Sequence, residues 1–360
     1  MNPRAATGLS GSMRYRLPLI ALGAALLAAC GPTADPSASD SAVPPAPASA
    51  SASAAPSDSG ISVHIQGAEP AFPNTLVDEE FVLPAALTFA DGAYHLWGKA
   101  FDAENEIFPR TFYATSPDLV DWEVADTDPL AEIGLVLESP GPVPASVLEE
   151  ADGTWVMFLW GYPSEGVPVF YRATAAEPEG PWTADPEPVL TRTSGSWDGG
   201  GLDFPTVVHT GGGYLMLYSA WRLSEPGSDV VGVATSSDGT TWTKGAEPVI
   251  RPGLCGAFDA RSITLPRLRS AGPTGWYLFY NGLGEDLSGA ASVGVASSPD
   301  LQTWTCANPV PALVAADIPD SEGIHTIAVA ADAQGPEFLV ESLGDGFSNL
   351  WMGDVSMPAP

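Results

Sequence analysis

The sequence predicts an all-β fold, a five-bladed propeller whose four-stranded antiparallel blades are about 60 residues long. Tryptophans that end an acidic turn recur 60, 60 and 62 residues apart, at Trp122, Trp182, Trp242 and Trp304. Prolines that open apolar, β-branched runs recur 60, 61 and 61 residues apart, at Pro84, Pro144, Pro205 and Pro266. The 38 glycines and 36 prolines also exclude long helices and favour short strands with frequent turns.

A secretory signal precedes the repeats. Basic residues at 13–16 lead into an apolar run of 13 residues, 17–29. As a helix this run would be about 20 Å long, which is too short to span a ~30 Å hydrocarbon layer. The ending Leu27-Ala28-Ala29-Cys30 resembles the bacterial lipobox, which implies cleavage after residue 29 and lipidation of Cys30. An ordinary secretory signal that happens to end near a cysteine is the alternative. We expect an exported protein on the extracytoplasmic side, held to the membrane only by the lipid on Cys30.

A linker follows the signal. Residues 31–60 are almost entirely Ala, Ser, Pro, Asp and Gly, without an aromatic side chain, so they cannot bury a core. The sequence therefore predicts a signal peptide at 1–29, a lipidated Cys30 with a disordered linker at 30–60, and the propeller at 61–360. A strand-like run begins at Ile61, and we expect residues 61–75 to supply the outer strand that the fifth repeat lacks.

The charge balance narrows the classes of partner. Asp and Glu number 44 against 13 Lys and Arg, for a formal net charge of −31, and Lys99 and Lys244 are the two lysines. Neutralising phosphates takes clustered basic residues, so we expect no nucleic-acid binding. An anionic membrane surface would also repel the protein.

Two cysteines remain once Cys30 carries a lipid. Cys255 precedes the fourth inner strand and Cys306 follows Trp304. In an exported protein the pair predicts a disulfide, with two free buried thiols as the alternative. Neither cysteine has a histidine or a second cysteine at metal-ligand spacing, so a zinc site is not expected.

Candidate functional residues lie on the inner strands, because the first strand of each propeller blade lines the central channel. An acid stands at each strand entry with spacings of 60, 60, 61 and 61, at Asp78, Glu138, Asp198, Asp259 and Asp320. Each one could simply cap a turn, but as a set they could raise one another's pKa or bind calcium. Two further acids, Asp203 and Glu322, lie deeper on the third and fifth inner strands than the acids at the strand entries. Arg261 suits a carboxylate or sugar hydroxyls, or it neutralises Asp259.

The repeats resemble five-bladed glycosidases, most closely glycoside hydrolase family 43 and the related families 32, 62 and 68. The motifs that carry the resemblance are the Ser-Pro-Asp-Leu turns at Ser116 and Ser298, Asp152-Gly153, the strand at 213–219, and the segment Gly323-Ile324-His325-Thr326-Ile327. The last is similar to the family's Gly-His segment. The resemblance implies that no cofactor is required, and that a structural calcium can bind near His325 in the central channel.

The family's catalytic carboxylates are matched only in part. The family uses a base Asp on blade one, an Asp on blade two that tunes the pKa of the acid, and an acid Glu on blade three. In this chain Leu83 and Val143 stand at the first two positions, and Asp203 stands at the third. Asp203 is thus the expected acid. The candidate replacements for the missing pair are Asp198, Asp259 and Glu322. The expected sugar-binding residues are Arg261, His325, Trp197, Glu138 and Asp78, although blade packing is the alternative for Trp197.

Two functions follow from the resemblance. The first is hydrolysis of glycans that contain arabinose, xylose or fructose, by a monomer that takes an oligo- or polysaccharide. The second is a propeller without catalysis that binds carbohydrate or a surface protein, which Leu83 and Val143 favour. The segment 236–242 also resembles a sialidase Asp-box, but sialidases need three clustered arginines, and only Arg261, Arg267 and Arg269 lie near an inner strand.

Overall fold

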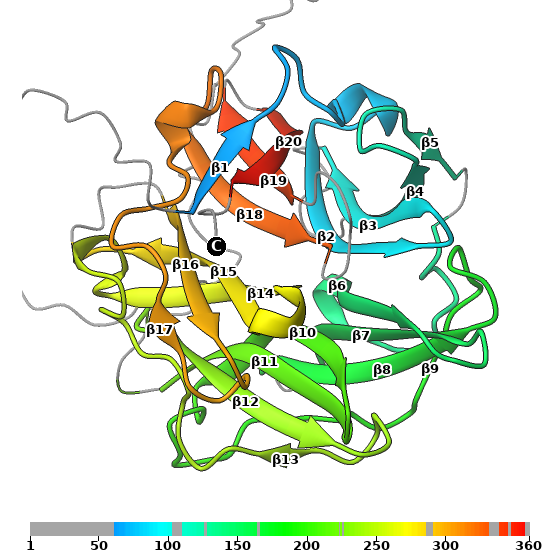
Figure 1. Cartoon of the computed structure of the whole chain (residues 1–360). Helices are drawn as coiled ribbons and strands as arrows, with labels where there is room; N and C mark the ends of the chain where they lie inside the picture. The colour runs from blue at the N-terminus through cyan, green and yellow to red at the C-terminus, as the bar shows by residue number, and fades with distance from the viewer. Residues whose placement is uncertain are drawn as a thin grey trace, which may run out of the picture. The chain divides into compact units, whose positions relative to one another are not determined.

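The chain folds as a ring of sheets around a central axis (Figure 1). The computed structural model describes residues 61–356, apart from 103–109, 126–127, 164–165, 223, 225–226, 286–290, 331–337 and 345–346. The described residues form five four-stranded antiparallel sheets, which confirms the predicted five-bladed propeller. The predicted signal peptide, Cys30 and the linker lie outside the described residues.

Each of the first four blades is one continuous segment of chain, ordered from the axis outward. Blade one contains β2 (Phe81–Ala90), β3 (Ala93–Phe101), β4 (Arg110–Ser116) and β5 (Glu123–Val124). Blade two contains β6 (Glu138–Glu149), β7 (Trp155–Tyr162), β8 (Val169–Ala175) and β9 (Thr183–Ala184). Blade three contains β10 (Gly201–Thr210), β11 (Gly213–Trp221), β12 (Val230–Ser236) and β13 (Thr243–Lys244). Blade four contains β14 (Ser262–Ser270), β15 (Trp276–Leu283), β16 (Ser292–Ser298) and β17 (Thr305–Cys306).

The fifth blade closes the ring with both ends of the domain. Its order is β18 (Gly323–Val329), β19 (Phe338–Gly344), β20 (Phe347–Ser356) and then β1 (Ser62–Ile65). Figure 1 shows β1, in blue, beside the red β20, and the two strands pair antiparallel. Asn308 of blade four also donates a 2.9 Å hydrogen bond to the Ile61 carbonyl. The prediction that residues 61–75 supply the missing outer strand is therefore confirmed.

Helical structure in the described residues is limited to four single turns of 3-10 helix. They are η1 (Asn74–Leu76), η2 (Ala257–Asp259), η3 (Gly272–Thr274) and η4 (Ala315–Asp317). None of the helices in the described part of the chain is long and apolar enough to span a membrane.

The recurring acidic turns hold the outer strands. Asp118 accepts hydrogen bonds from the backbone N–H groups of Val120 and Asp121, and the Trp122 indole donates to the Leu119 carbonyl at 3.0 Å. The same two carboxylate bonds recur in the turns of blades three and four, at Asp238 and Asp300. The backbone donors lower the pKa of these carboxyl groups. This part of the acidity is therefore structural.

Each inner strand is interrupted by a β-bulge near the axis. The register with the second strand shifts between Pro84 and Ala86, Pro144 and Ser146, Asp203 and Thr206, Thr264 and Arg267, and Ile324 and Ile327. Proline has no N–H to donate, so a bulge is one of the few places where a sheet accepts it. The periodic prolines of the sequence therefore mark the bulges.

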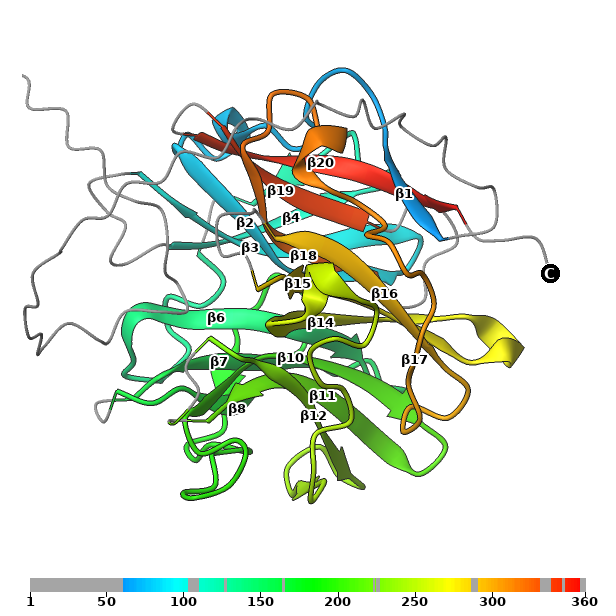
Figure 2. The same cartoon turned by 90° about the vertical axis from the view of Figure 1, so that its left-hand side faces the viewer.

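Arg267 ties three blades together at the axis. Its side chain is 5% exposed, and its Nε donates to the carbonyl of Ile327 in β18 at 3.0 Å. One terminal nitrogen donates to the carbonyl of Ala85 in β2 at 3.4 Å, and the other to Pro266 at 3.2 Å. Burial lowers the pKa of Arg267 to about 10, although the charge of Asp203 opposes the shift. Figure 2 shows β14 and β18 side by side from the edge of the ring.

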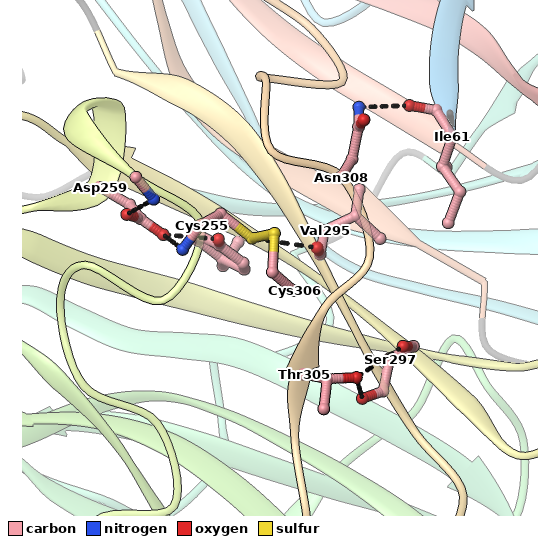
Figure 3. The surroundings of a disulfide bond; sticks show 10 residues. Ile61, Cys255, Asp259, Val295, Ser297, Thr305, Cys306 and Asn308 are labelled. Atoms are coloured by element: carbon pink, nitrogen blue, oxygen red, sulfur yellow. Dashed lines mark hydrogen bonds between the residues drawn. A yellow bond between two sulfur atoms is a disulfide. The ribbon is translucent and has the colours of Figure 1, made fainter. Parts of the chain in front are cut away.

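The predicted disulfide joins Cys255 and Cys306, with Cα atoms 5.1 Å apart (Figure 3). Cys306 lies in β17, which pairs with β16 through only two residues. Cys255 lies in the loop before β14, where the Asp259 carboxylate accepts hydrogen bonds from the N–H groups of Cys255 and Gly256. The disulfide therefore fastens a short outer strand to the entry of its own blade.

We expect replacement of Cys255 and Cys306 together by alanine to lower the free energy of unfolding by about 2–4 kcal/mol, because the crosslink closes a 51-residue loop. Urea denaturation followed by tryptophan fluorescence measures the change, with the oxidised and reduced wild-type domain as references. Equal stability of the double variant and the oxidised domain would show that β17 holds without the crosslink.

Candidate active site

The strand register defines a ring of equivalent positions just before the bulges. They are Leu83, Val143, Asp203, Thr264 and Ile324, which pair with the second-strand residues Lys99, Trp160, Ser219, Asn281 and Ser342. Within this inner ring Asp203 is the one carboxylate. The candidate site is therefore centred on blade three and on the side of blade four that faces it.

Asp203 is a buried acid with an incomplete set of partners. It is 6% exposed, and its Oδ1 has no hydrogen-bond partner. Burial is the main cause that raises its pKa well above the usual range, and the charge of Asp229 adds to the rise. A hydrogen bond with Ser219 and the charge of Arg267 oppose it. Asp203 is thus suited to hold a proton at pH values where ordinary carboxyl groups are ionised.

Asp229 is the second acid of the site and precedes β12. Its Oδ2 accepts a 2.7 Å hydrogen bond from the Ser262 hydroxyl, and its carbonyl accepts one from the Ile263 N–H at 3.1 Å. Burial raises its pKa and outweighs Ser262, its own N–H and the charge of Arg261, which lower it, so the net direction is up. The sequence analysis missed Asp229 because it does not recur with the blades. The available signal was an acid directly before a third strand, where the other repeats have none.

Arg261 and Tyr162 complete the surroundings of the two acids. The Nε of Arg261 is buried without a hydrogen-bond partner. The charge of Arg261 acts on Asp229. The sequence suggested Asp259 as its partner, but Asp259 is fully buried and accepts a 2.8 Å hydrogen bond from the Tyr280 hydroxyl. Burial raises the pKa of Tyr162 to about 12, and the charge of Asp203 adds to the shift. Tyr162, at the end of β7, was also missed.

His325 pairs with a buried carboxylate that the sequence analysis did not single out. Its Nδ1 is 3.1 Å from Oε2 of Glu341, which is 1% exposed, while the His325 side chain is 39% exposed. Burial lowers the pKa of His325, but the charge and hydrogen bond of Glu341 outweigh it, so the net direction is up. Burial raises the pKa of Glu341. Among the described residues no three His, Cys, Asp or Glu side chains are grouped closely enough to hold a metal ion. A calcium ion near His325, which the sequence resemblance implies, stays a prediction.

Asp198 and Trp197 lie in the wall of blade three. Asp198 is 1% exposed, forms an ion pair with Lys244 of β13, and accepts a hydrogen bond from the Thr193 N–H. Trp197 stacks on Tyr218, with ring centroids 6.1 Å apart, and its indole donates to a backbone carbonyl of the blade. The structure thus gives Trp197 the packing role.

The acids at the strand entries are not brought together as one cluster. Asp198 and Asp259 are buried in local hydrogen bonds, as described above. The remaining members of the periodic set, and Glu322 beside them, are exposed at the entries of their blades: Asp78, Glu138, Asp320 and Glu322. The periodic spacing therefore predicted the positions of these residues along the strands, but not a shared cluster of their side chains at one end of the central channel.

Lys99 is a buried amine opposite Leu83. It is 3% exposed and donates to the Thr111 hydroxyl at 3.2 Å and to the Pro142 carbonyl, in blade two, at 3.1 Å. Burial lowers its pKa to about 8, against the opposing charge of Asp128. Lys99 thus joins blade one to the inner strand of blade two.

Comparison with known proteins identifies relatives of the fold. No protein-family model matches the chain, and no curated protein is similar to it in sequence. A thermostable family-43 glycoside hydrolase has a TM-score of 0.59 and 16% identity, covering 82% of this chain and 97% of its own. The α-L-arabinofuranosidase PaAbf62A of Podospora anserina, in complex with cellotriose, has a TM-score of 0.58 and 12% identity, covering 84% and 100%. Zg3597, a family 117 glycoside hydrolase of the marine bacterium Zobellia galactanivorans, has a TM-score of 0.57 and 15% identity, covering 83% and 91%.

These similarities agree with the resemblance seen in the sequence motifs. At such identities they concern the fold, which is shared over 82–84% of this chain. The chain has the five-bladed β-propeller fold of these glycoside hydrolases.

Proposed function

We propose that this protein is an exported, lipid-anchored glycoside hydrolase that acts on glycans containing furanose or pentose sugars, such as arabinose, xylose or fructose. The observation that carries the proposal is Asp203, a buried acid in the inner ring of the propeller whose Oδ1 has no hydrogen-bond partner and whose pKa is raised by burial. The neighbouring structures include an arabinofuranosidase in complex with an oligosaccharide, which supports a carbohydrate ligand. The lipobox-like sequence before Cys30 supports the anchor.

In this proposal Asp203 is the general acid. Its proton passes to the glycosidic oxygen as the bond from that oxygen to the anomeric carbon breaks. Its Oδ1 is buried without a hydrogen-bond partner, whereas Ser219, in β11, hydrogen-bonds the carboxyl group. The Nε of Arg261 is likewise buried without a partner, and a bound sugar hydroxyl would satisfy it.

A carbohydrate-binding propeller without hydrolysis is the second candidate. It is favoured by Leu83 and Val143, which put apolar side chains at two of the five inner positions. Retained glycan binding without turnover of any glycoside would select it.

We expect Asp203→Asn to lower kcat/KM by about 10²–10⁴-fold on glycosides with a poor leaving group, because the amide cannot give up a proton. Initial rates of the purified domain on aryl and oligosaccharide arabinosides, xylosides and fructosides measure the effect. Asp203→Glu is the matched control, since it keeps an acid one methylene longer and should retain part of the rate. Full turnover by Asp203→Asn would remove the acid assignment.

The stability of the domain gives a test that needs no substrate. Because the folded state raises the pKa of Asp203, the folded protein binds its proton more tightly than the unfolded chain does. The stabilisation that this proton gives the folded state is fully present below the pKa of Asp203 in the unfolded chain. It is lost as the pH rises through the pKa of Asp203 in the folded protein. We therefore expect Asp203→Asn to be more stable than wild type at pH 8, with a difference that shrinks toward pH 4. Urea denaturation at a series of pH values measures it, and a pH-independent difference would contradict it.

The proposed anchor depends on Cys30. We expect the full-length protein to partition with membranes and to take up labelled fatty acid in the native host, and Cys30→Ser to lose the label because serine has no sulfur to receive the diacylglyceryl group. Detergent phase partition of the two forms provides the measurement. Equal partition of wild type and Cys30→Ser into the aqueous phase would favour the ordinary secretory signal.

A further inference from the structure

We propose that a cleft between the turns of blades three and four is a carbohydrate-binding site separate from the central channel, and that it holds an uncharged oligosaccharide. The inference goes beyond the proposed function, because it concerns binding alone and holds whether or not Asp203 cuts a glycoside. The cleft has a volume of about 1000 Å³, at the upper end of the ~300–1000 Å³ range of ligand pockets. It therefore has room for more than one sugar ring.

The cleft lies at the end of blade three that is far from Asp203. His209 and Thr210 belong to its lining and end β10, the strand in which Asp203 stands near the start. The six residues of strand from Asp203 to His209 span roughly 20 Å, at ~3.3 Å per residue. The lining continues through the β12–β13 turn, the start of β15 and the β16–β17 turn. A ligand in the cleft therefore leaves the inner-ring position of Asp203 free.

Two aromatic side chains of the cleft are partly exposed, although their counterparts in the other blades are buried. The second strand of every blade has an aromatic residue as its first or second member, namely Tyr94, Trp155, Tyr214, Trp276 and Phe338. Tyr94, Trp155 and Phe338 are 3%, 4% and 0% exposed. Tyr214 and Trp276 are only partly buried, and both line the cleft. Open aromatic faces of this kind pack against the apolar C–H faces of sugar rings.

Neighbouring side chains hold the Tyr214 ring in place. Its hydroxyl donates a 2.8 Å hydrogen bond to Oε1 of Glu150 in blade two. The centroids of the His209 and Tyr214 rings are 5.0 Å apart, and Nε2 of His209 is 3.7 Å from the same oxygen of Glu150. Burial and the hydrogen bond with Glu150 raise the pKa of Tyr214 to about 12, so the hydroxyl keeps the proton that it donates. A ring that is already fixed loses little conformational entropy when a ligand binds.

The polar groups of the cleft suit the hydroxyl groups of a sugar. Asp238 and Asp300 are exposed, and each carboxylate accepts two hydrogen bonds from backbone N–H groups of its own turn. These bonds lower the pKa of both carboxyl groups, which are therefore anions that accept hydrogen bonds from hydroxyl groups. The amide of Gln302 adds a donor and an acceptor. The described residues that line the cleft include no lysine or arginine, so an uncharged glycan fits better than an anionic one.

The hairpin between β10 and β11 leaves the cleft open. Gly211 and Gly212 form its tip and line the cleft, and a Cβ atom added at either position would have no heavy atom within 4 Å. The hairpin therefore contributes backbone but no side chain to this wall. The Tyr214 ring, just after the hairpin, stays accessible as a result.

The test measures binding to the full-length protein, purified in detergent, in an Asp203→Asn background that keeps the ligand from being cut. The probes are arabino-, xylo- and fructo-oligosaccharides, with oligogalacturonate as the anionic probe. Isothermal titration calorimetry gives the number of sites per chain and their affinities. We expect Trp276→Ala to weaken one site at least about tenfold, because the variant loses an aromatic face. We also expect the uncharged probes to bind more tightly than oligogalacturonate.

A second variant removes a polar group without disturbing the packing. Gln302→Ala replaces an exposed side chain and should weaken the same site about three- to tenfold, because the lost amide bonds a sugar hydroxyl. Gln66→Ala is the matched control, since it removes the same amide group next to β1, outside the cleft, and should leave binding unchanged. Gln302→Ala carries the test if Trp276→Ala does not fold, as judged by circular dichroism.

The outcomes separate this inference from the proposed function. Weaker binding in Trp276→Ala and Gln302→Ala, with aryl glycoside turnover unchanged when Asp203 is present, supports the cleft. Unchanged affinities in the folded cleft variants, tighter binding of oligogalacturonate, or a chain that binds none of the probes overturns it. Turnover of aryl glycosides by the wild type is measured separately, and it would leave the proposed function intact in each of these cases.

Discussion

The ring depends on polar side chains that cross from one blade to the inner strand of the next. Arg267 does so at the axis, where one guanidinium binds carbonyls of blades five and one. Further out, the crossing bonds are Lys99 to the Pro142 carbonyl, the Leu265 N–H to Ser219, Asn281 to the His325 carbonyl, and Ser348 to Val82. A bulge leaves backbone groups of the inner strand without ladder partners, and these bonds supply them. The inner strands are thus positioned by the same contacts that close the ring.

Those contacts also explain why the unsatisfied groups gather beside the junctions. The Asn281 amide donates to the His325 carbonyl of blade five. Its Oδ1 is buried without a hydrogen-bond partner, as is the Oδ1 of Asp203. Phe204 and Leu265, which follow the inner-ring positions of blades three and four, hold φ values of 48° and 52°, a conformation that costs a non-glycine residue free energy. A positive-φ residue and an unpaired polar atom therefore occur together in both blade three and blade four, close to the inner-ring positions.

The sequence was sufficient for the fold because the features that repeat are those that build a blade. The tryptophans end turns, the prolines mark bulges, and the run at Ile61 had no blade to join except the last. The site was predicted only in part, because spacing along a strand does not fix where a side chain turns. Asp198 has the same spacing as the other entry acids, yet Lys244, 46 residues later, draws it into the wall of its blade. Asp229 matches no repeat, so periodicity could not find it.

The departures from the family pattern and the raised pKa of Asp203 are physically linked. Lys99, opposite Leu83, is committed to Thr111 and to blade two, so blade one offers no charge to the channel at this level. Trp160, opposite Val143, packs edge-on against Phe204, with centroids 5.2 Å apart, so blade two offers an aromatic wall. An apolar wall on that side favours the protonated form of Asp203, and burial also raises the pKa of Asp229, although Ser262 and Arg261 oppose that rise. The residues that replace the family's acids on blades one and two therefore contribute to the burial that raises the pKa of Asp203.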